Sequence, residues 1–180
     1  MTAVLHSSTS GALALVAVLA SVGCSAQLPP SAPHDLLGKP GEVQSAAALD
    51  GTLVAFPERG RVTVVDFWGT SCKPCIAAMP GLEDLYQDKK GAGLTVVGVA
   101  VDDNPGLVDE TLKKLGVHYP NLLDDTSSSV RGAFLVTDIP RSFVFDRKGK
   151  LRLVIGGEDK ERDMVSVVRQ AVDFLLEESP

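Results

Sequence analysis

The 180-residue sequence has 44% hydrophobic residues and a formal net charge of −6. This length and apolar content suffice for one buried core of ordinary domain size. Acidic and basic residues are scattered along the chain without a basic arm or stripe, so the composition argues against nucleic acid as a partner.

The first segment, residues 1–24, has the features of an export signal. Residues 11–20 form an apolar run that is too short to cross a bilayer, which takes about 20 residues. Small residues then lead to Cys24, and this junction resembles a bacterial lipoprotein signal, although residues 1–10 lack Lys and Arg and Ser21 replaces the usual Leu. We expect export to a bacterial periplasm or cell envelope, with a lipid anchor at Cys24. The alternative is a leader that is simply cleaved.

Residues 25–40 are rich in proline and poor in large apolar side chains. Proline-rich segments favour the stiff, extended polyproline II conformation, so we expect a tether here. A single folded domain without internal repeats is then expected over residues 41–180.

The first half of this domain predicts a strand, a helix and a second strand. Residues 61–68 are mostly β-branched and aromatic, which favours a strand. Residues 70–90 carry apolar side chains at helical spacing, with Pro74 in the first turn and Pro80 at an expected kink. Residues 94–101 are continuously apolar, as in a strand that is buried on both faces.

The second half predicts a helix that ends at Gly116, two strands and a C-terminal helix. The strands cover residues 142–146 and 151–155 and are joined by a hairpin turn at Gly149, and the last helix covers residues 161–176. The strand-helix-strand order indicates parallel pairing, and the hairpin adds antiparallel strands. We therefore expect an α/β fold, a thioredoxin-like three-layer α/β/α sandwich with a mixed central sheet.

Cys72 and Cys75 stand where the first strand gives way to the first helix. Residues three apart on a helix share a face, so the two sulfurs can meet. The helix N-terminus favours a thiolate at Cys72. Lys73 adds a positive charge and Pro74 stiffens the turn, so Lys73 and Pro74 are expected to tune the redox properties of the cysteine pair. With three cysteines, three histidines and no second cysteine pair, the sequence disfavours zinc. We expect no metal and no organic cofactor, the redox group being the Cys72–Cys75 disulfide.

The segment around this pair, residues 65–75 (VDFWGTSCKPC), resembles the active-site segment of thioredoxins. With Met79 and Pro80 it resembles in particular the TlpA/ResA-like branch, whose members are exported, membrane-anchored thioredoxin-fold proteins. Many of them serve cytochrome c maturation or other extracytoplasmic thiol reduction. Residues 138–146 (DIPRSFVFD), with Gly149, are similar to the cis-proline loop and following strand of that family.

The resemblance implies a role for each matching residue. Cys72 matches the nucleophile and Cys75 the resolving cysteine. Trp68 matches a tryptophan that packs beside the pair and contributes to substrate binding. Pro140 matches the cis-proline that faces the disulfide, and Ile139 supplies the backbone that pairs with a substrate strand.

Three positions add to this pattern or depart from it. Asp66 matches the buried acid of thioredoxin, where many TlpA/ResA-like proteins carry Asn. Burial in an apolar strand predicts a raised pKa and a role as the base for Cys75, unless the side chain turns to solvent. Arg141 replaces the usual Thr after the cis-proline and is expected to place a positive charge near the docking groove. Asp102 and Asp103 stand where some relatives carry a functional buried Glu, or else form a solvated turn.

These features predict an extracytoplasmic thiol:disulfide oxidoreductase that acts on protein thiols and disulfides in the reducing direction. The expected electron donor is a membrane thiol reductase, and cytochrome c maturation is one pathway that the resemblance implies. A peroxiredoxin-type peroxidase is an alternative, but its PxxxTxxC pattern is absent because Thr70 lies two positions before Cys72 and the proline is missing. A non-enzymatic binding module is another, although such modules tend to lose Cys72, Cys75 or Pro140.

Overall fold

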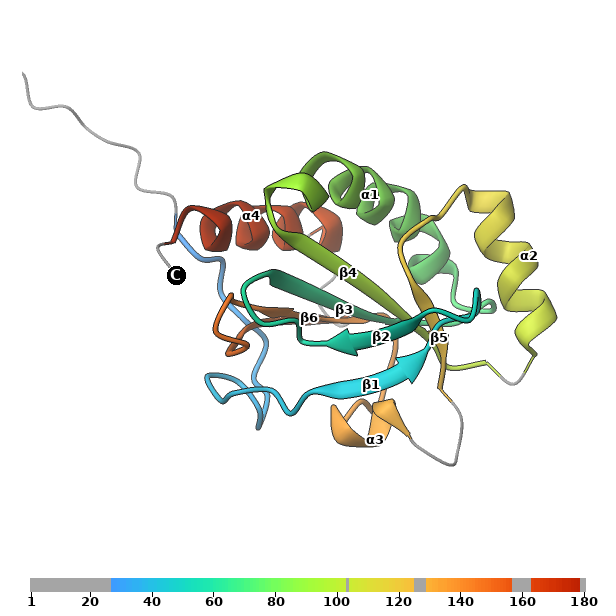
Figure 1. The fold of residues 1–180 in the computed structure, drawn as a ribbon, viewed down its shortest axis with the longest axis horizontal. Helices are drawn as coiled ribbons and strands as arrows, with labels where there is room; N and C mark the ends of the chain where they lie inside the picture. Colours follow the sequence, from blue (N-terminus) through green and yellow to red (C-terminus); the bar gives the residue numbers. More distant parts are fainter. Residues whose placement is uncertain (1–26, 103, 125–128, 157–162, 179–180) are drawn as a thin grey trace, which may run out of the picture.

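A five-stranded sheet forms the centre of the computed structural model, which describes residues 27–102, 104–124, 129–156 and 163–178 (Figure 1). Its strands are β3 (Val62–Trp68), β4 (Leu94–Ala100), β5 (Asn121–Leu123), β6 (Arg141–Phe145) and β7 (Leu151–Gly156), in the spatial order β5-β4-β3-β6-β7. Strands β3, β4 and β5 are parallel, whereas β6 is antiparallel to both β3 and β7. Both the predicted parallel unit and the predicted hairpin are therefore confirmed.

Some of the sequence predictions fall outside the described residues. They include the leader with its candidate lipidation site Cys24, the residue Asp103, and residues 161–162 at the start of the expected C-terminal helix. The predictions for these positions are not tested by the structure and stay predictions.

Helices and a hairpin cover the two faces of the sheet. One face carries α1 (Lys73–Lys89), the 3₁₀ turn η1 (Lys90–Ala92), α2 (Pro105–Leu115) and α4 (Met164–Glu177). The other face carries the short α3 (Val130–Ala133) and the hairpin of β1 (Gln44–Ala47) and β2 (Leu53–Phe56), as Figure 1 shows. The predicted three layers are confirmed, with a hairpin supplementing the second helical layer. None of the described helices is long and apolar enough to cross a membrane.

Strand β3 is buried along its whole length because it lies in the middle of the sheet with both faces covered. Val64 and Trp68 pack into the core beneath α1, whereas Val65 and Phe67 pack into the core on the opposite face. Since side chains alternate along a strand, Asp66 points to the α1 side. The strand thus delivers one carboxylate into the layer that contains the cysteine pair.

The N-terminal segment departs from the expected tether. The backbone N–H of Ala32 donates to the carbonyl of Val154 at 2.8 Å, and that of Gly38 donates to the carbonyl of Leu151 at 2.9 Å. Residues 32–38 therefore lie along β7, because the outer edge of this strand offers unpaired backbone groups. The described fold begins before the predicted start at residue 41.

Candidate active site

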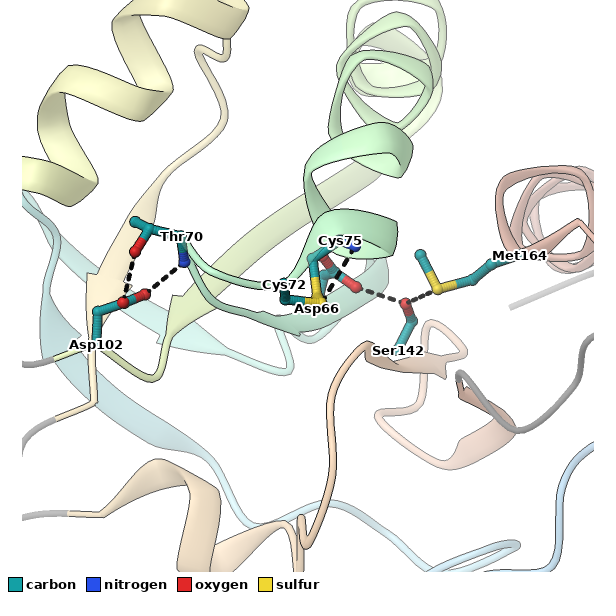
Figure 2. The surroundings of a disulfide bond; sticks show 7 residues. All are labelled: Asp66, Thr70, Cys72, Cys75, Asp102, Ser142 and Met164. Atoms are coloured by element: carbon teal, nitrogen blue, oxygen red, sulfur yellow. Dashed lines mark hydrogen bonds between the residues drawn. A yellow bond between two sulfur atoms is a disulfide. The ribbon is translucent and has the colours of Figure 1, made fainter.

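Cys72 and Cys75 form a disulfide at the N-terminus of α1 (Figure 2), with an S–S length of 2.02 Å and Cα atoms 5.3 Å apart. Cys72 is the N-cap of this helix, and its Sγ accepts a hydrogen bond from the backbone N–H of Cys75 at 3.3 Å. Cys72 is partly exposed, whereas Cys75 is 1% exposed and belongs to the core. Of the two sulfurs, only that of Cys72 is open to a partner.

Lys73 and Pro74 lie between the cysteines and are both exposed. Pro74 is in the first turn of α1, where its missing N–H leaves no helical hydrogen bond unmade. The local sequence thus ends a strand, starts a helix and stiffens the turn within a few residues. The effect of Lys73 and Pro74 on the redox pair stays a prediction.

The turn that precedes the pair is held by Asp102, which follows β4 (Figure 2). The backbone N–H of Thr70 donates to Oδ2 of Asp102 at 2.8 Å, and the Thr70 hydroxyl donates to Oδ1 at 2.7 Å. Asp102 therefore anchors the active-site turn, a contact that the sequence did not predict.

Trp68 is held in place by a side chain from β5. The indole N–H donates to Oδ1 of Asn121 at 2.9 Å, and the Asn121 amide donates to the carbonyl of Tyr119 at 2.9 Å. Asn121 fits because its register partner is Gly98, where a Cβ would lie 1.9 Å from Oδ1. The sequence reasoning missed Asn121, although a glycine inside an apolar strand can signal such a close approach.

Asp66 is 1% exposed, as expected, and is not turned to solvent. Burial raises the pKa of its carboxyl to about 7, and the hydrogen bond from Ser142 opposes that rise. Oγ of Ser142 donates to Oδ1 of Asp66 at 2.6 Å. The predicted rise in pKa is confirmed, while the role of Asp66 as a base stays a prediction.

The predicted cis-proline loop adjoins the turn before the cysteines. The Ile139–Pro140 peptide bond is cis, and Pro140 is buried. Ile139 packs against both cores, and its Cδ1 would lie 3.1 Å from a Cβ built on Gly69. The structure therefore brings the loop and the start of α1 together at one edge of the sheet.

Arg141, which is expected to place a positive charge near the docking groove, directly follows the cis-proline. Its guanidinium pairs with Asp138, and the side chain is 15% exposed. It also lies over the backbone of Gly156 on β7, where a Cβ would approach Cζ to 2.8 Å. The positive charge is present near the cis-proline loop, but it is paired and directed toward β7.

The sheet order, the helix that begins at a cysteine pair and the adjacent cis-proline define a thioredoxin-fold protein with a redox-capable disulfide. Residues 31–172 match the Redoxin family model, and the chain belongs to this family. It is 32% identical over 113 residues to the thiol-disulfide oxidoreductase ResA of Geobacillus kaustophilus, covering 61% of this chain and 64% of that relative. The chain thus spans slightly less than two thirds of the length of this curated relative.

Solved structures agree with this placement. A thiol:disulfide interchange protein of Chlorobium tepidum has a TM-score of 0.68 and 25% identity, covering 79% of this chain and 99% of its own. The dsbF protein of MTB, solved in mixed oxidised and reduced forms, has a TM-score of 0.64 and 28% identity, and the match covers 73% of this chain and 94% of the dsbF chain. The predicted TlpA/ResA-like, thioredoxin-fold character of the chain is confirmed.

Proposed function

We propose that this protein exchanges disulfides with protein partners through Cys72 and Cys75. The observation that carries the proposal is the disulfide at the N-terminus of α1, with the first sulfur accessible and the second 1% exposed beside the core. An attacking thiol needs access to its partner, and a resolving thiol needs shielding from competitors. The likeness to the thiol-disulfide oxidoreductase ResA supports the same chemistry.

In the reducing direction, the Cys72 thiolate attacks a partner disulfide, forms a mixed disulfide and releases one partner sulfur as a thiolate. Cys75 then transfers its proton to the Asp66 carboxylate and attacks the sulfur of Cys72. The second partner sulfur leaves, the partner has gained two electrons, and the enzyme carries the disulfide. A membrane thiol reductase restores the dithiol, and no metal or organic cofactor enters the cycle.

The residues around the pair divide the remaining tasks. The Ile139 backbone before Pro140 pairs with an extended partner segment, and Trp68 supports the surface on which that segment lies. Lys73 favours the Cys72 thiolate by its charge. Arg141, which is paired with Asp138, borders the loop and contributes to the choice of partner.

We further propose that the protein acts outside the cytoplasm, in the periplasm or cell envelope, with Cys24 lipidated. The apolar run of residues 11–20 before Cys24 supports export, and the resemblance of residues 65–75 to the TlpA/ResA-like branch implies an envelope function such as cytochrome c maturation. Cys24→Ser is expected to remove the protein from the membrane fraction. Retention of the cleaved variant in membranes would contradict the lipid anchor.

Trapping of the mixed disulfide tests the chemistry. Cys75→Ser is expected to accumulate covalent partner complexes that a reductant releases, because the first attack proceeds and resolution does not. Cys72→Ser is the matched control and is expected to trap nothing. The unaltered protein is expected to reduce insulin disulfides, whereas consumption of peroxide without insulin reduction would favour the peroxidase alternative.

A further inference from the structure

We propose that Ser142 is a positioning residue for Asp66, whose ionised carboxylate it holds in one orientation on the α1 side of the sheet. The inference deepens the proposed function and rests on it in one respect, because Asp66 is the proposed base for Cys75. Ser142 is not among the site residues that the sequence pattern predicts.

The position of Ser142 follows from the pairing of two strands. Asp66 of β3 and Ser142 of β6 are register partners in an antiparallel pair, so their side chains point to the same face. Ser142 is 0% exposed, and its Oγ lies 2.6 Å from Oδ1 of Asp66, a short distance typical of a hydroxyl that donates to a carboxylate. Both partners are therefore fixed by backbone pairing rather than by a flexible loop.

This hydrogen bond acts on one protonation state. Among the described residues, the side-chain donor to the Asp66 carboxyl is the hydroxyl of Ser142. A donor that points at a carboxylate stabilises the ionised form, whereas burial favours the neutral form. Ser142 therefore keeps Asp66 available as a proton acceptor at a site where burial alone would hold the proton on it.

A second acceptor lies on the other side of the Ser142 hydroxyl. Figure 2 shows Ser142 between Asp66 and Met164, and its Oγ is 3.5 Å from Sδ of Met164 at the start of α4. A hydroxyl has one hydrogen to donate. Once Asp66 has taken up a proton, its O–H donates to Ser142, and the Ser142 hydrogen turns to the weakly accepting sulfur. The serine thus has a partner in both protonation states.

Besides the Glu83 carboxylate of α1, two other buried titratable groups share this side of the sheet with Asp66. Tyr119, which precedes β5, has a buried hydroxyl with no hydrogen-bond partner among the residues that the structure describes. Burial and the charges of Asp66 and Glu83 raise the pKa of Tyr119 well above 10, so the phenol stays neutral where Asp66 titrates. Cys75 on α1 is the other group, and in the oxidised protein it carries no proton. The described residues of β6 and α4 that hydrogen-bond in this arrangement, Ser142 and Met164, carry no charge.

Titration of Asp66 in the oxidised protein tests the inference directly. Its carboxyl carbon is followed by NMR against pH, first in the unaltered protein and then in Ser142→Ala. The midpoint is expected to rise by about one pH unit, the scale of a lost hydrogen bond to an ionised group. Thr63→Val is the matched control. Like Ser142, Thr63 of β3 has a buried hydroxyl, but this hydroxyl accepts a hydrogen bond from the backbone N–H of Glu58 and does not contact Asp66. Thr63→Val is therefore expected to leave the Asp66 midpoint unchanged.

Met164→Leu tests the same arrangement from the other side and keeps a side chain of similar size. Removal of the sulfur weakens the neutral state of Asp66, so its midpoint is expected to fall by a few tenths of a pH unit. An unchanged midpoint in Ser142→Ala, an equal rise in Thr63→Val, or a rise in Met164→Leu would overturn the proposal.

The titration requires no partner and no turnover, so its result is independent of the proposed function. Decay of the mixed disulfide in Ser142→Ala is then measured over the same pH range. It is expected to slow several-fold below the raised midpoint and to recover above it. A shifted midpoint with unchanged decay would support the Ser142 contact and would remove Asp66 from the role of base.

Discussion

Two carboxylates are buried on the α1 side of the sheet, and their pKa values move in opposite directions. Asp66 in β3 is 1% exposed and accepts a hydrogen bond from Ser142, and burial raises its pKa to about 7. Glu83 in α1 is 7% exposed. Burial also acts to raise the pKa of Glu83, but hydrogen bonds from Gln87, His118 and Tyr119 outweigh it, and the pKa is lowered.

The comparison shows that donors, rather than burial, decide which buried carboxyl keeps its charge. Glu83 accepts the backbone N–H groups of His118 at 2.8 Å and Tyr119 at 3.3 Å, so it ties the segment before β5 to α1. Asp66 accepts from a side chain of the neighbouring strand and is left able to take up a proton. One carboxylate is therefore structural, and the other has the properties of a proton acceptor.

The largest expected difference between them lies in the pH dependence of stability. The pKa of Asp66 is raised from 3.8 to about 7, so its neutral form stabilises the fold below pH 4, and this stability is lost as the pH rises through 7. Asp66→Asn removes that loss. We expect the variant to gain about 4 kcal/mol relative to the unaltered protein between pH 4 and pH 8, measured as free energy of unfolding in urea.

Glu83 supplies the internal control for this measurement. Its pKa is lowered from 4.5, so its contribution is present above that pH and is lost as the pH falls through the folded-state value. The difference in unfolding free energy between each variant and the unaltered protein should therefore change with pH in a different range: between about pH 4 and pH 7 for Asp66→Asn, and below pH 4.5 for Glu83→Gln. Parallel curves for the two variants would contradict the comparison.

The next effect is kinetic. In Asp66→Asn, the decay of the mixed disulfide near pH 7 should slow by about two orders of magnitude, the low end of the range for the loss of a general base. The first attack by Cys72 should be nearly unchanged, because it does not depend on Cys75 losing its proton. Rapid-quench measurement should show the intermediate building up. Unchanged decay would exclude Asp66 as the base.

Glu83→Gln should change stability without changing exchange. The amide oxygen can take the place of Oε2 and keep both backbone N–H bonds, but these bonds lose the charge of the carboxylate, and the NH₂ group cannot accept from the Gln87 amide, so we expect a loss of about 2 kcal/mol near neutral pH. His118→Ala is the matched control, because it removes a side chain that is 71% exposed and keeps both backbone donors. It should cost less. A slower exchange in Glu83→Gln would show that the two carboxylates are not separate in function.

Local patterns were sufficient to predict the parts of the site that lie close together in sequence. The strand with Asp66, the cysteine pair at a helix start and the cis-proline loop all follow from short segments. The contacts of Asn121 with Trp68 and of Asp102 with Thr70 do not, because they depend on which strands become neighbours in the sheet.

The hairpin of β1 and β2 and the docking of residues 32–38 on β7 were missed for a related reason. Their segments are short, and their position depends on edges and surfaces that exist only once the sheet has formed. Sequence patterns therefore predicted the reactive residues better than they predicted the contacts that hold those residues in place.

Asp102 extends the comparison to a carboxylate that has two donors and is only partly buried, and here we expect the smallest effect. Thr70→Val removes the hydroxyl donor and keeps the backbone N–H bond. The unfolding free energy should fall by about 1 kcal/mol, because solvent can replace part of the lost bond. Asp102→Ala removes both bonds and should cost more. Since Thr70→Val has nothing left to remove once Asp102 is absent, the double variant should be no less stable than Asp102→Ala alone. Strictly additive losses in this cycle would mean that the Thr70 and Asp102 side chains act independently, and that the hydrogen bond between them does not stabilise the active-site turn.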